Sequence, residues 1–272
     1  MLRDITIGQY FPKDSLLHRL DPRVKIVLTL CYIIMLFAAS NPIGLIIGIV
    51  FLAVAYGVSG IPAAMILKSL KPVTPVIIFT AALNMFFIAG DPIWSFWKIQ
   101  ITVQGLWTAV VMSIRILCLI AGTSLLTYTT SPIALTDGIE QLLDPLKRFH
   151  LPVHELAMMM TIALRFIPTL IEETDKIIAA QKARGADMES GGLIQRAKAL
   201  IPILIPLFVS AFRRADELAL AMECRCYRGG EGRTRMRRLK IQGQDIICCI
   251  ITGFCIAAVI AVNLMAPHLI PM

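Results

Sequence analysis

Long stretches of this sequence carry no charged residue, and they limit what the chain can fold into more than any other feature. Residues 26–67 are uncharged over 42 positions, residues 72–90 over 19 and residues 246–272 over 27. Because the hydrocarbon core of a bilayer is about 30 Å thick, roughly 20 apolar helical residues are enough to cross it. The runs therefore predict a polytopic membrane protein of the all-α class.

The composition agrees with this class. Of the 272 residues, 57% are hydrophobic and 16% are charged, whereas a typical soluble domain is about 25% charged. These proportions exclude a disordered chain, a disulfide-rich secreted module and a nucleic-acid-binding protein of ordinary composition.

About five transmembrane helices are predicted. The first uncharged run is divided at Ser40-Asn41-Pro42, because a proline can open a helix but does not continue one, and its second span extends to Leu67. The other spans cover residues 72–90, about 106–128 and about 245–266. The fourth span contains one charge, Arg115, which is compatible with a functional pathway or with a packing role in which it bonds carbonyl groups between helices.

The distribution of Lys and Arg predicts the orientation. The N-terminal segment has five basic residues, namely Arg3, Lys13, Arg19, Arg23 and Lys25. The tip of the first hairpin, residues 40–44, has none, and 14 of the 26 basic residues fall between positions 176 and 240. Since short cytoplasmic loops are enriched in Lys and Arg, we expect a cytoplasmic N-terminus and an extracellular C-terminus. The first 25 residues lack an apolar core, so no signal peptide is expected.

The segment between the fourth and fifth spans is too long for a connecting loop. It is expected to form one short helix, about residues 132–149, and two long amphipathic helices, about 153–185 and 193–227. Each long helix would measure about 50 Å at 1.5 Å per residue, and its apolar part is followed by a charged part. The predicted domains are therefore a membrane part, 1–131, a cytoplasmic-side coupling domain, 132–240, and a C-terminal transmembrane helix, 241–272.

Few residues are suited to chemistry. Cys224 and Cys226 have no third ligand at metal-binding spacing, and no phosphate-binding Gly-rich loop with the P-loop spacing occurs. An intramembrane enzyme would need ionisable pairs within its spans, where this chain has one Arg and no carboxylate. A self-sufficient permease would be expected to show internal repeats and broken helices, and neither is evident. No catalytic residue, metal site or cofactor is therefore predicted in this chain.

The two long helices are predicted to end alike. One closes with Gln181-Lys182-Ala183-Arg184-Gly185, and the other with Met222-Glu223-Cys224-Arg225-Cys226 followed by Gly229-Gly230. Each end places an Arg between small residues, with glycine following as the C-cap. A simpler interpretation is that the charges offset the helix dipole, worth about 0.3–1 kcal/mol. Arg165, next to Pro168, is expected to bond carbonyl groups that the proline leaves free.

These segments resemble the transmembrane T component of energy-coupling factor (ECF) transporters, bacterial importers of vitamins and metal ions. The resemblance covers nearly the whole chain and is strongest over residues 126–187. The segments that carry it are Ala163-Leu164-Arg165-Phe166-Ile167-Pro168, Ala183-Arg184-Gly185, residues 225–235, Ile7-Gly8-Gln9-Tyr10 and Leu17-His18-Arg19-Leu20-Asp21-Pro22-Arg23. The sequence departs from the family pattern at Cys224-Arg225-Cys226, where Ala-Arg-Gly is usual.

The resemblance implies a non-catalytic scaffold in the bacterial plasma membrane. Its partners would be two cytoplasmic ABC ATPases, which bind the ATP and Mg²⁺, and an interchangeable membrane-embedded S component, which binds the vitamin. The residues implied in ATPase docking are Ala183, Arg184, Gly185, Cys224, Arg225 and Cys226. Those expected to pack against the S component are Met158, Met159, Met160, Leu204 and Leu207. The resemblance favours a shared, vitamin-type module; a T component of a cobalt or nickel importer is the alternative, and a self-sufficient permease is a weaker one.

Overall fold

The computed structural model describes residues 10–88, 92–96, 99–149, 152–186, 192–229 and 239–265. The chain divides into two compact units. The first unit, called the bundle here, comprises the described parts of residues 8–138 and 238–272. The second, called the arm, comprises the described parts of residues 139–237.

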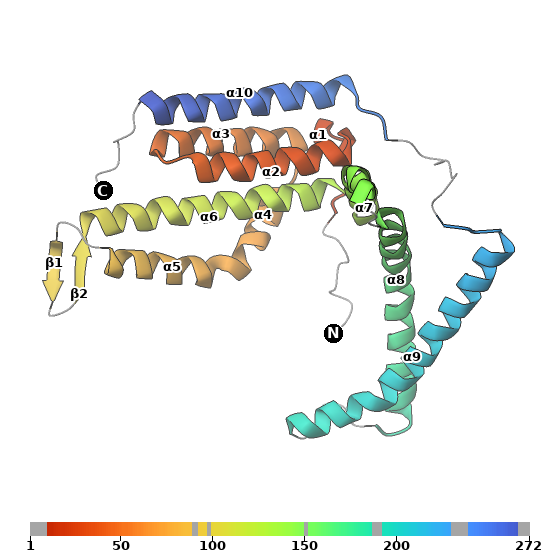
Figure 1. Ribbon diagram of the computed structural model, residues 1–272. Helices are drawn as coiled ribbons and strands as arrows, with labels where there is room; N and C mark the ends of the chain where they lie inside the picture. The colour runs from red at the N-terminus through yellow and green to blue at the C-terminus, as the bar shows by residue number, and fades with distance from the viewer. Residues whose placement is uncertain are drawn as a thin grey trace. The chain divides into compact units, whose positions relative to one another are not determined.

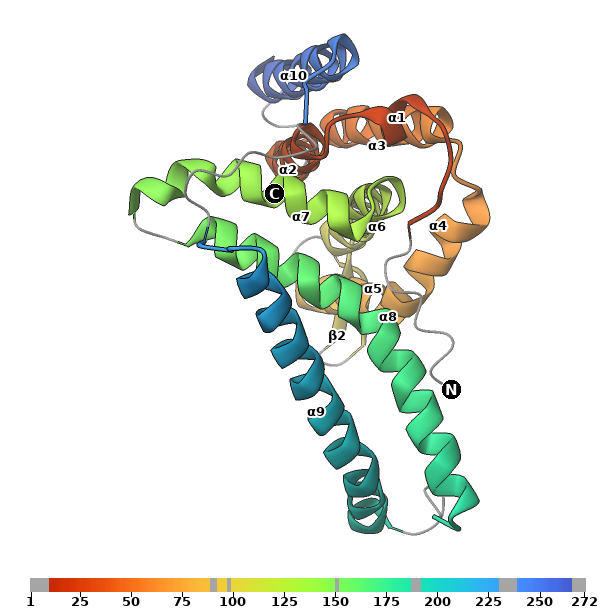
Figure 2. The same ribbon diagram turned by 90° about the vertical axis from the view of Figure 1, so that its right-hand side faces the viewer.

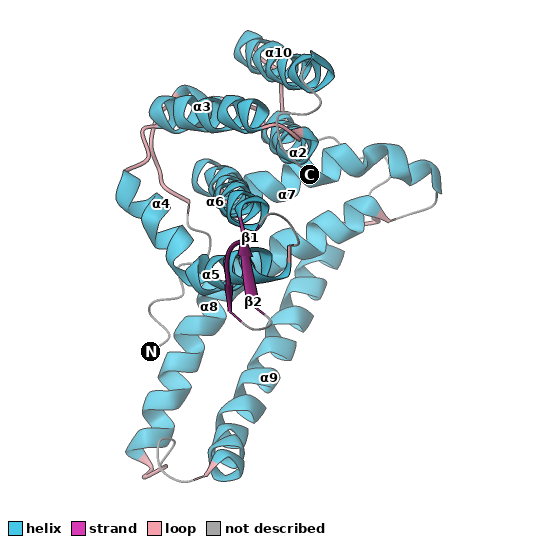
Figure 3. Ribbon diagram, turned by 90° about the vertical axis from the view of Figure 1, so that its left-hand side faces the viewer, coloured by secondary structure: helices cyan, strands magenta, loops and turns pink. Residues whose placement is uncertain are grey.

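Long helices lying side by side form the bundle (Figure 1). They are α2 (Pro22–Ala38), α3 (Pro42–Ser59), α5 (Thr74–Phe87), α6 (Val103–Thr129) and α10 (Gly243–Met265). The shorter helical elements are α1 (Leu16–Arg19), α4 (Ala63–Leu70) and the 3₁₀ turn η2 (Lys71–Val73). A short antiparallel hairpin, β1 (Pro92–Phe96) with β2 (Ile99–Thr102), joins α5 to α6 and was not predicted (Figure 3).

The prediction of an all-α polytopic membrane protein is confirmed apart from this hairpin. In the part of the chain that the structure describes, five helical segments are long and apolar enough to cross a membrane, namely α3, residues 63–87 (α4 to α5), α6, α8 (Val153–Ala183) and α10. This set differs from the predicted one, which counted α2 and excluded α8. Helix α2 has 17 residues and is shorter than the four bundle segments in this set. It nevertheless runs beside α3, α6 and α10 (Figure 1). The set includes α8 because its first half is apolar.

The second predicted span ends earlier than expected. It was expected to continue to Leu67, but α3 ends at Ser59 because Gly60 adopts a left-handed conformation with φ +64°. The Gly60 amide donates to the Tyr56 carbonyl at 3.0 Å, and the Gly60 carbonyl accepts a hydrogen bond from Lys13 Nζ at 2.7 Å. Glycine adopts this conformation without steric cost, so it ends a helix even within an uncharged run.

The bundle core forms where α2, α3, α6 and α10 meet. One cluster of buried residues contains Tyr32, Met35, Leu36, Ala39, Leu45, Cys118 and Val259. A second contains Tyr56, Ile61, Ala121, Leu125 and Tyr128. Gly122 lets α6 approach α2, because a Cβ at that position would overlap the Tyr32 ring. Close approach at small residues is the usual way in which membrane helices gain packing contacts.

Several polar side chains within the bundle donate hydrogen bonds to main-chain carbonyls. At the end of α2, Arg115 of α6 donates to the Ala39 carbonyl at 2.6 Å, and Asn263 Nδ2 of α10 donates to the Ala38 carbonyl at 2.5 Å. The last carbonyls of a helix have no partner within it, and a membrane interior offers no water to satisfy them. Of the two interpretations of Arg115, this contact supports the packing role.

Residues 11–25, before and at the start of α2, form a compact polar cap. The imidazole of His18 donates from Nε2 to the Phe11 carbonyl at 3.0 Å, and its Nδ1 lies 2.7 Å from the Ser15 hydroxyl. Partial burial is the main cause that lowers the pKa of His18 below its ordinary value. A neutral ring that donates from Nε2 accepts at Nδ1, so the Ser15 hydroxyl is the donor there. Lys25 is buried and donates to the carbonyls of His18 at 3.1 Å and Thr129 at 2.9 Å.

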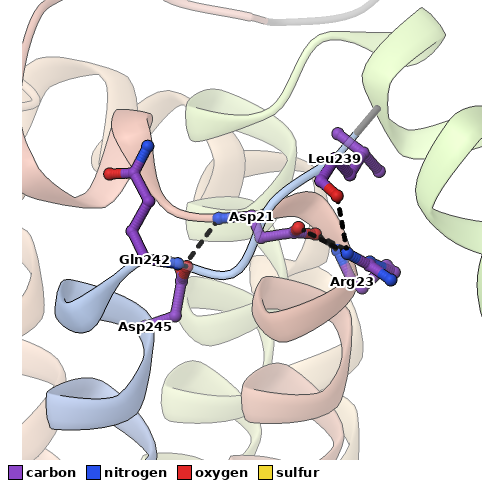
Figure 4. A network of polar contacts seen from close by, with 5 residues as sticks. All are labelled: Asp21, Arg23, Leu239, Gln242 and Asp245. Carbon is purple, nitrogen blue, oxygen red and sulfur yellow. Dashed lines mark hydrogen bonds and ion pairs between the residues drawn. The ribbon is translucent and has the colours of Figure 1, made fainter. Parts of the chain in front are cut away.

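Asp245 joins the start of α10 to the start of α2 (Figure 4). This side chain is 1% exposed and accepts from the amides of Asp21 at 2.9 Å and Gln242 at 2.6 Å. Asp21 caps α2 by accepting from the Arg23 amide at 2.9 Å and pairs with the Arg23 guanidinium at 3.0 Å. Arg23 also donates to the Leu239 carbonyl at 3.4 Å. The network therefore ties together two segments more than 200 residues apart in sequence.

Removing the Asp245 carboxylate should destabilise the bundle. In Asp245→Ala the buried Asp21 amide loses its acceptor, and we expect the free energy of unfolding to fall by about 2–4 kcal/mol. Asp245→Asn should cost less, because the amide oxygen still accepts one of the two hydrogen bonds. Thermal unfolding of the full chain in detergent measures the change. The exposed Asp14→Ala is the control, and an equal effect of both alanine variants would contradict this role for Asp245.

Candidate functional site

The arm is dominated by the two long helices predicted from the sequence. After α7 (Pro132–Leu143) and the 3₁₀ segment η3 (Asp144–Phe149) come α8, with 31 residues, and α9 (Leu193–Cys224), with 32 residues. The prediction of one short and two long helices is confirmed. Pro168 lies inside α8, and Pro202 and Pro206 lie inside α9, without ending either helix.

Helices α8 and α9 are antiparallel neighbours (Figure 2). Their strongest polar contact is made by Glu173 of α8, which accepts from Arg214 of α9 at 2.7 Å and from the Ser210 hydroxyl. Nearer the end of α8, Gln181 Nε2 donates to the Pro202 carbonyl at 3.3 Å. An ion pair with a second hydrogen bond on the same carboxylate holds the two helices in register at this point.

The two helix ends share one backbone geometry. In α8 the C-cap residue is Arg184; the next two amides, of Gly185 and Ala186, donate to the carbonyls of Lys182 and Gln181, both at 3.0 Å. In α9 the C-cap residue is Arg225. The amides that follow it, of Cys226 and Tyr227, donate to the carbonyls of Glu223 and Met222 at 2.8 and 3.0 Å. Both ends are therefore Schellman motifs with arginine at the C-cap.

The two motifs differ in the residue that takes the left-handed conformation. Gly185 has φ +84° in the first, and Cys226 has φ +57° in the second. The prediction that glycine caps both helices is wrong for α9, since Gly229 lies three residues beyond Cys226. A side chain in the left-handed region costs roughly 1–2 kcal/mol. The end of α9 thus keeps the backbone geometry of the end of α8 at some cost in strain.

Arg184 and Arg225, called the signature arginines here, are exposed together with the small residues beside them. Ala183, Arg184, Gly185, Cys224, Arg225 and Cys226 are all at the surface of the described structure. Within the described residues, neither guanidinium has a hydrogen bond or an ion pair. Each arginine lies eleven residues beyond the Glu173–Arg214 contact (173 to 184 and 214 to 225). At 1.5 Å per residue this is about 16 Å, and because the helices are antiparallel the arginines point to opposite ends of the pair.

Two separate groups of apolar side chains lie on the same two helices, one early in α8 and one in the middle of α9. Met159 and Met160 of α8 and Leu204 of α9 are exposed, whereas Met158 and Leu207 are half-buried. Further large side chains are exposed on α9, among them Ile205, Phe208 and Phe212, which were not named in the prediction. Their spacing of three and four residues along one helix face is the signal that could have identified them.

Arg165 does not behave as expected. It is exposed on α8, and in the described part of the chain it makes no hydrogen bond to the carbonyls near Pro168. The prediction that it satisfies carbonyls freed by the proline is therefore not supported. It leaves a permanent charge on an otherwise apolar stretch of α8.

Comparison with known proteins decides the family. A family model described as CbiQ, cobalt transport protein, matches residues 13–236. The chain belongs to this family of ECF transporter T components. A protein of Ruminiclostridium cellulolyticum named energy-coupling factor transporter transmembrane protein EcfT is 55% identical over 265 residues, which is 97% of this chain and 98% of the relative.

Two further relatives with the same name come from Clostridium kluyveri and Bacillus subtilis. The first is 56% identical over 94% of this chain and 97% of the relative, and the second 47% identical over 90% and 93%. The resemblance inferred from the helix-end motifs is thus confirmed over almost the full length of the chain. As a T component, the chain is a multi-pass membrane subunit of a transporter.

The strain at Cys226 gives a testable prediction about the second signature. Cys226→Val should loosen the end of α9, because a β-branched side chain is disfavoured in the left-handed region. We expect the amides of residues 226 and 227 to exchange with solvent about tenfold faster, which corresponds to about 1.4 kcal/mol. Cys226→Gly should leave the exchange unchanged or slow it. Hydrogen-exchange mass spectrometry of the purified chain measures both.

The matched control is Cys224→Val, two residues earlier and within the helix. There the same substitution meets ordinary helical backbone and should change the exchange by less than twofold. Equal acceleration in both valine variants would show that the left-handed conformation of Cys226 is not what the substitution disturbs.

Proposed function

We propose that this chain is the non-catalytic scaffold of an ECF-type vitamin importer. It would transmit the motion of two ATP-hydrolysing subunits to an S component that binds the vitamin. The observation that carries the proposal is that each of the two antiparallel helices ends in an exposed arginine C-cap, so the two arginines lie at opposite ends of the helix pair. Membership of the T component family supports it.

Each signature arginine is suited to anchor one ATPase. A guanidinium is planar, permanently charged and able to bond a carboxylate through two parallel hydrogen bonds. The flanking residues Ala183, Gly185, Cys224 and Cys226 are small, so a groove on a partner can close around the arginine without a steric clash. The alternative is that these charges only offset the helix dipole. That role would not require small neighbours or the repetition of the motif at both helix ends.

These two groups of apolar side chains on α8 and α9 are proposed to bind the S component. Met158, Met159, Met160, Leu204 and Leu207, with Ile205, Phe208 and Phe212, offer mostly exposed apolar side chains. Large apolar side chains that are exposed in groups on a monomer usually mark an interface. Methionine side chains adapt to partners of different shape, which suits a scaffold that serves interchangeable S components.

The same proposal places the subunit in the bacterial plasma membrane with a cytoplasmic N-terminus and an extracellular C-terminus. The basic residues of segments 3–25 and 176–240 support this orientation. ATP and Mg²⁺ would be held by the ATPase subunits, and this chain would bind no cofactor. The docking arginines would then face the cytoplasm, where the ATPases are.

A metal-ion importer is the second candidate, because the matching family model is described as a cobalt transport protein. The relatives named above are called energy-coupling factor transporter proteins, and no metal appears in their names. The two candidates are separated by purifying the tagged chain with its partners and identifying the S component. A bound vitamin would support the first, cobalt or nickel the second, and recovery of the chain alone with intact transport would indicate a self-sufficient permease.

Loss of the signature arginines should uncouple the transporter. Arg184→Ala or Arg225→Ala would leave a partner carboxylate unpaired at a buried interface, at a cost of about 2–5 kcal/mol. This corresponds to about 30-fold or more in ATPase affinity. We expect each variant to abolish vitamin uptake and the double variant to lose both ATPases from isolated membranes. Lysine at either position should rescue only partly, since an ammonium group cannot form the bidentate pair.

Arg213→Ala is the matched control for these variants. Arg213 is an exposed arginine of α9 away from the helix end, and its loss should leave the ATPases bound. Arg237, a further candidate control suggested by the sequence, lies outside the described residues. Normal uptake by the Arg184→Ala, Arg225→Ala double variant would refute the docking role and leave these residues as ordinary helix-end charges.

A separate substitution tests the S component surface. Met159→Asp or Leu204→Asp places a carboxylate on the exposed apolar face, where desolvating it at an interface is costly. The S component should then fail to co-purify while both ATPases remain bound. Leu204→Met, which keeps the surface apolar, should retain all partners. Joint loss of the ATPases and the S component in the aspartate variants would mean that this region is needed for folding.

A further inference from the structure

The bundle contains an apolar cavity that the proposed function does not use. Its volume is about 300 Å³, and it is lined by α1, α2, α3, α6 and α10. Most of its walls are hydrocarbon, including Leu28, Phe51, Val54, Leu126 and Ile251. An apolar cavity of half this size in a soluble protein stays dry and binds benzene. This cavity is therefore large enough for a hydrocarbon segment and is unsuited to ions or water.

The cavity occupies one half of the bundle. Its lining residues come from the first turns of α2 and α10 and from the last turns of α3 and α6. Along α2 it extends from Lys25 to Tyr32, and along α6 from Gly122 to Thr129, which is about 10 Å of helix in each case. Half of the hydrocarbon core of a bilayer is about 15 Å thick. The cavity thus runs parallel to the chains of one lipid leaflet, over much of their length.

The mouth of the cavity is basic. A second hollow, formed by residues 13–16, 19 and 57–60, shares Leu16 and Val58 with the apolar cavity. Two exposed cations, Lys13 and Arg19, and one carboxylate, Asp14, line this hollow, so its net charge is positive. Lys13 Nζ is held at the mouth by its 2.7 Å hydrogen bond to the Gly60 carbonyl. Lys25 does not contribute in this way, because its ammonium group is already bonded to two carbonyls.

We propose that this composite site binds one anionic phospholipid of the phosphatidylglycerol type. One acyl chain lies in the apolar cavity, and the headgroup phosphate lies between Lys13 and Arg19. A half-open apolar cavity within a membrane protein is reached by lipid chains, which fill it without the cost of dehydration. Basic pockets between transmembrane helices are suited to anionic headgroups, with each nearby cation adding to the attraction. The site is formed by the bundle alone and does not depend on the proposed coupling role.

Photocrosslinking of the full chain in lipid nanodiscs tests the site. The probe is phosphatidylglycerol with a photoactivatable diazirine in one acyl chain, in a phosphatidylcholine background. Mass spectrometry should locate the crosslinks on the peptides that contain residues 51–58, 122–129 and 247–252. Unlabelled phosphatidylglycerol should suppress these crosslinks, and added phosphatidylcholine should do so much less. This comparison uses the unaltered protein, so it does not depend on the folding of any variant.

Two variants test the two parts of the site separately. Val54→Trp should fill the cavity and reduce the crosslinks at least fivefold. Val50→Trp is the matched control, because Val50 is similarly exposed on the same helix, one turn away and outside the cavity lining. Lys13→Gln combined with Arg19→Gln should weaken competition by phosphatidylglycerol about tenfold, whereas Lys68→Gln, an exposed lysine of α4, should not.

Three results would overturn the assignment. The first is equal labelling of the Val54→Trp and Val50→Trp variants. The second is equal competition by phosphatidylcholine and phosphatidylglycerol, which would remove the headgroup site. The third is suppression of the crosslinks by inorganic phosphate alone, which would assign the basic hollow to a free anion.

Discussion

A bilayer core contains no water, so polar groups inside the bundle are stabilised by partners within the chain. The short helix α2 shows how strongly this governs the structure. Its last carbonyls accept from Arg115 of α6 and Asn263 of α10, and Lys25 near its start donates to two further carbonyls. Asp245 of α10 then bonds the amide of Asp21 immediately before α2. These polar and charged side chains hold the spans together, which agrees with the proposed scaffold role.

The arm follows the opposite rule. Its two long helices bind each other through Glu173, Ser210 and Arg214, yet they leave large apolar side chains and the two helix-end arginines exposed at the surface. A helix pair of this composition would be poorly soluble alone and is understandable as part of an assembly. The charged stretches and the apolar stretches of the same helices suit partners of different kinds, one in water and one in the membrane.

Much of the architecture could be predicted from local sequence features. Uncharged runs indicated the spans, Pro42 marked the start of α3, and the length of the segment after Thr130 required additional helices. The end of α3 could not be predicted, because Gly60 lies in an apolar run that contains other glycines inside the helix. The contact between Asp21 and Asp245 joins residues 224 positions apart, and no local pattern in one sequence indicates such a pairing. The signature arginines were identified because their motif occurs twice. The left-handed conformation of Cys226 was not foreseen, since it depends on main-chain hydrogen bonds rather than on residue type.

The Glu173–Arg214 contact has a mechanical consequence. It lies eleven residues from each signature arginine, on antiparallel helices, so the two lever lengths about it are equal at about 16 Å. If the two arginines are held by separate partner subunits that approach each other, the helices cannot slide along one another without breaking this ion pair. They rotate about the ion pair instead. A displacement at the two anchored ends then becomes a change in the crossing angle of α8 and α9.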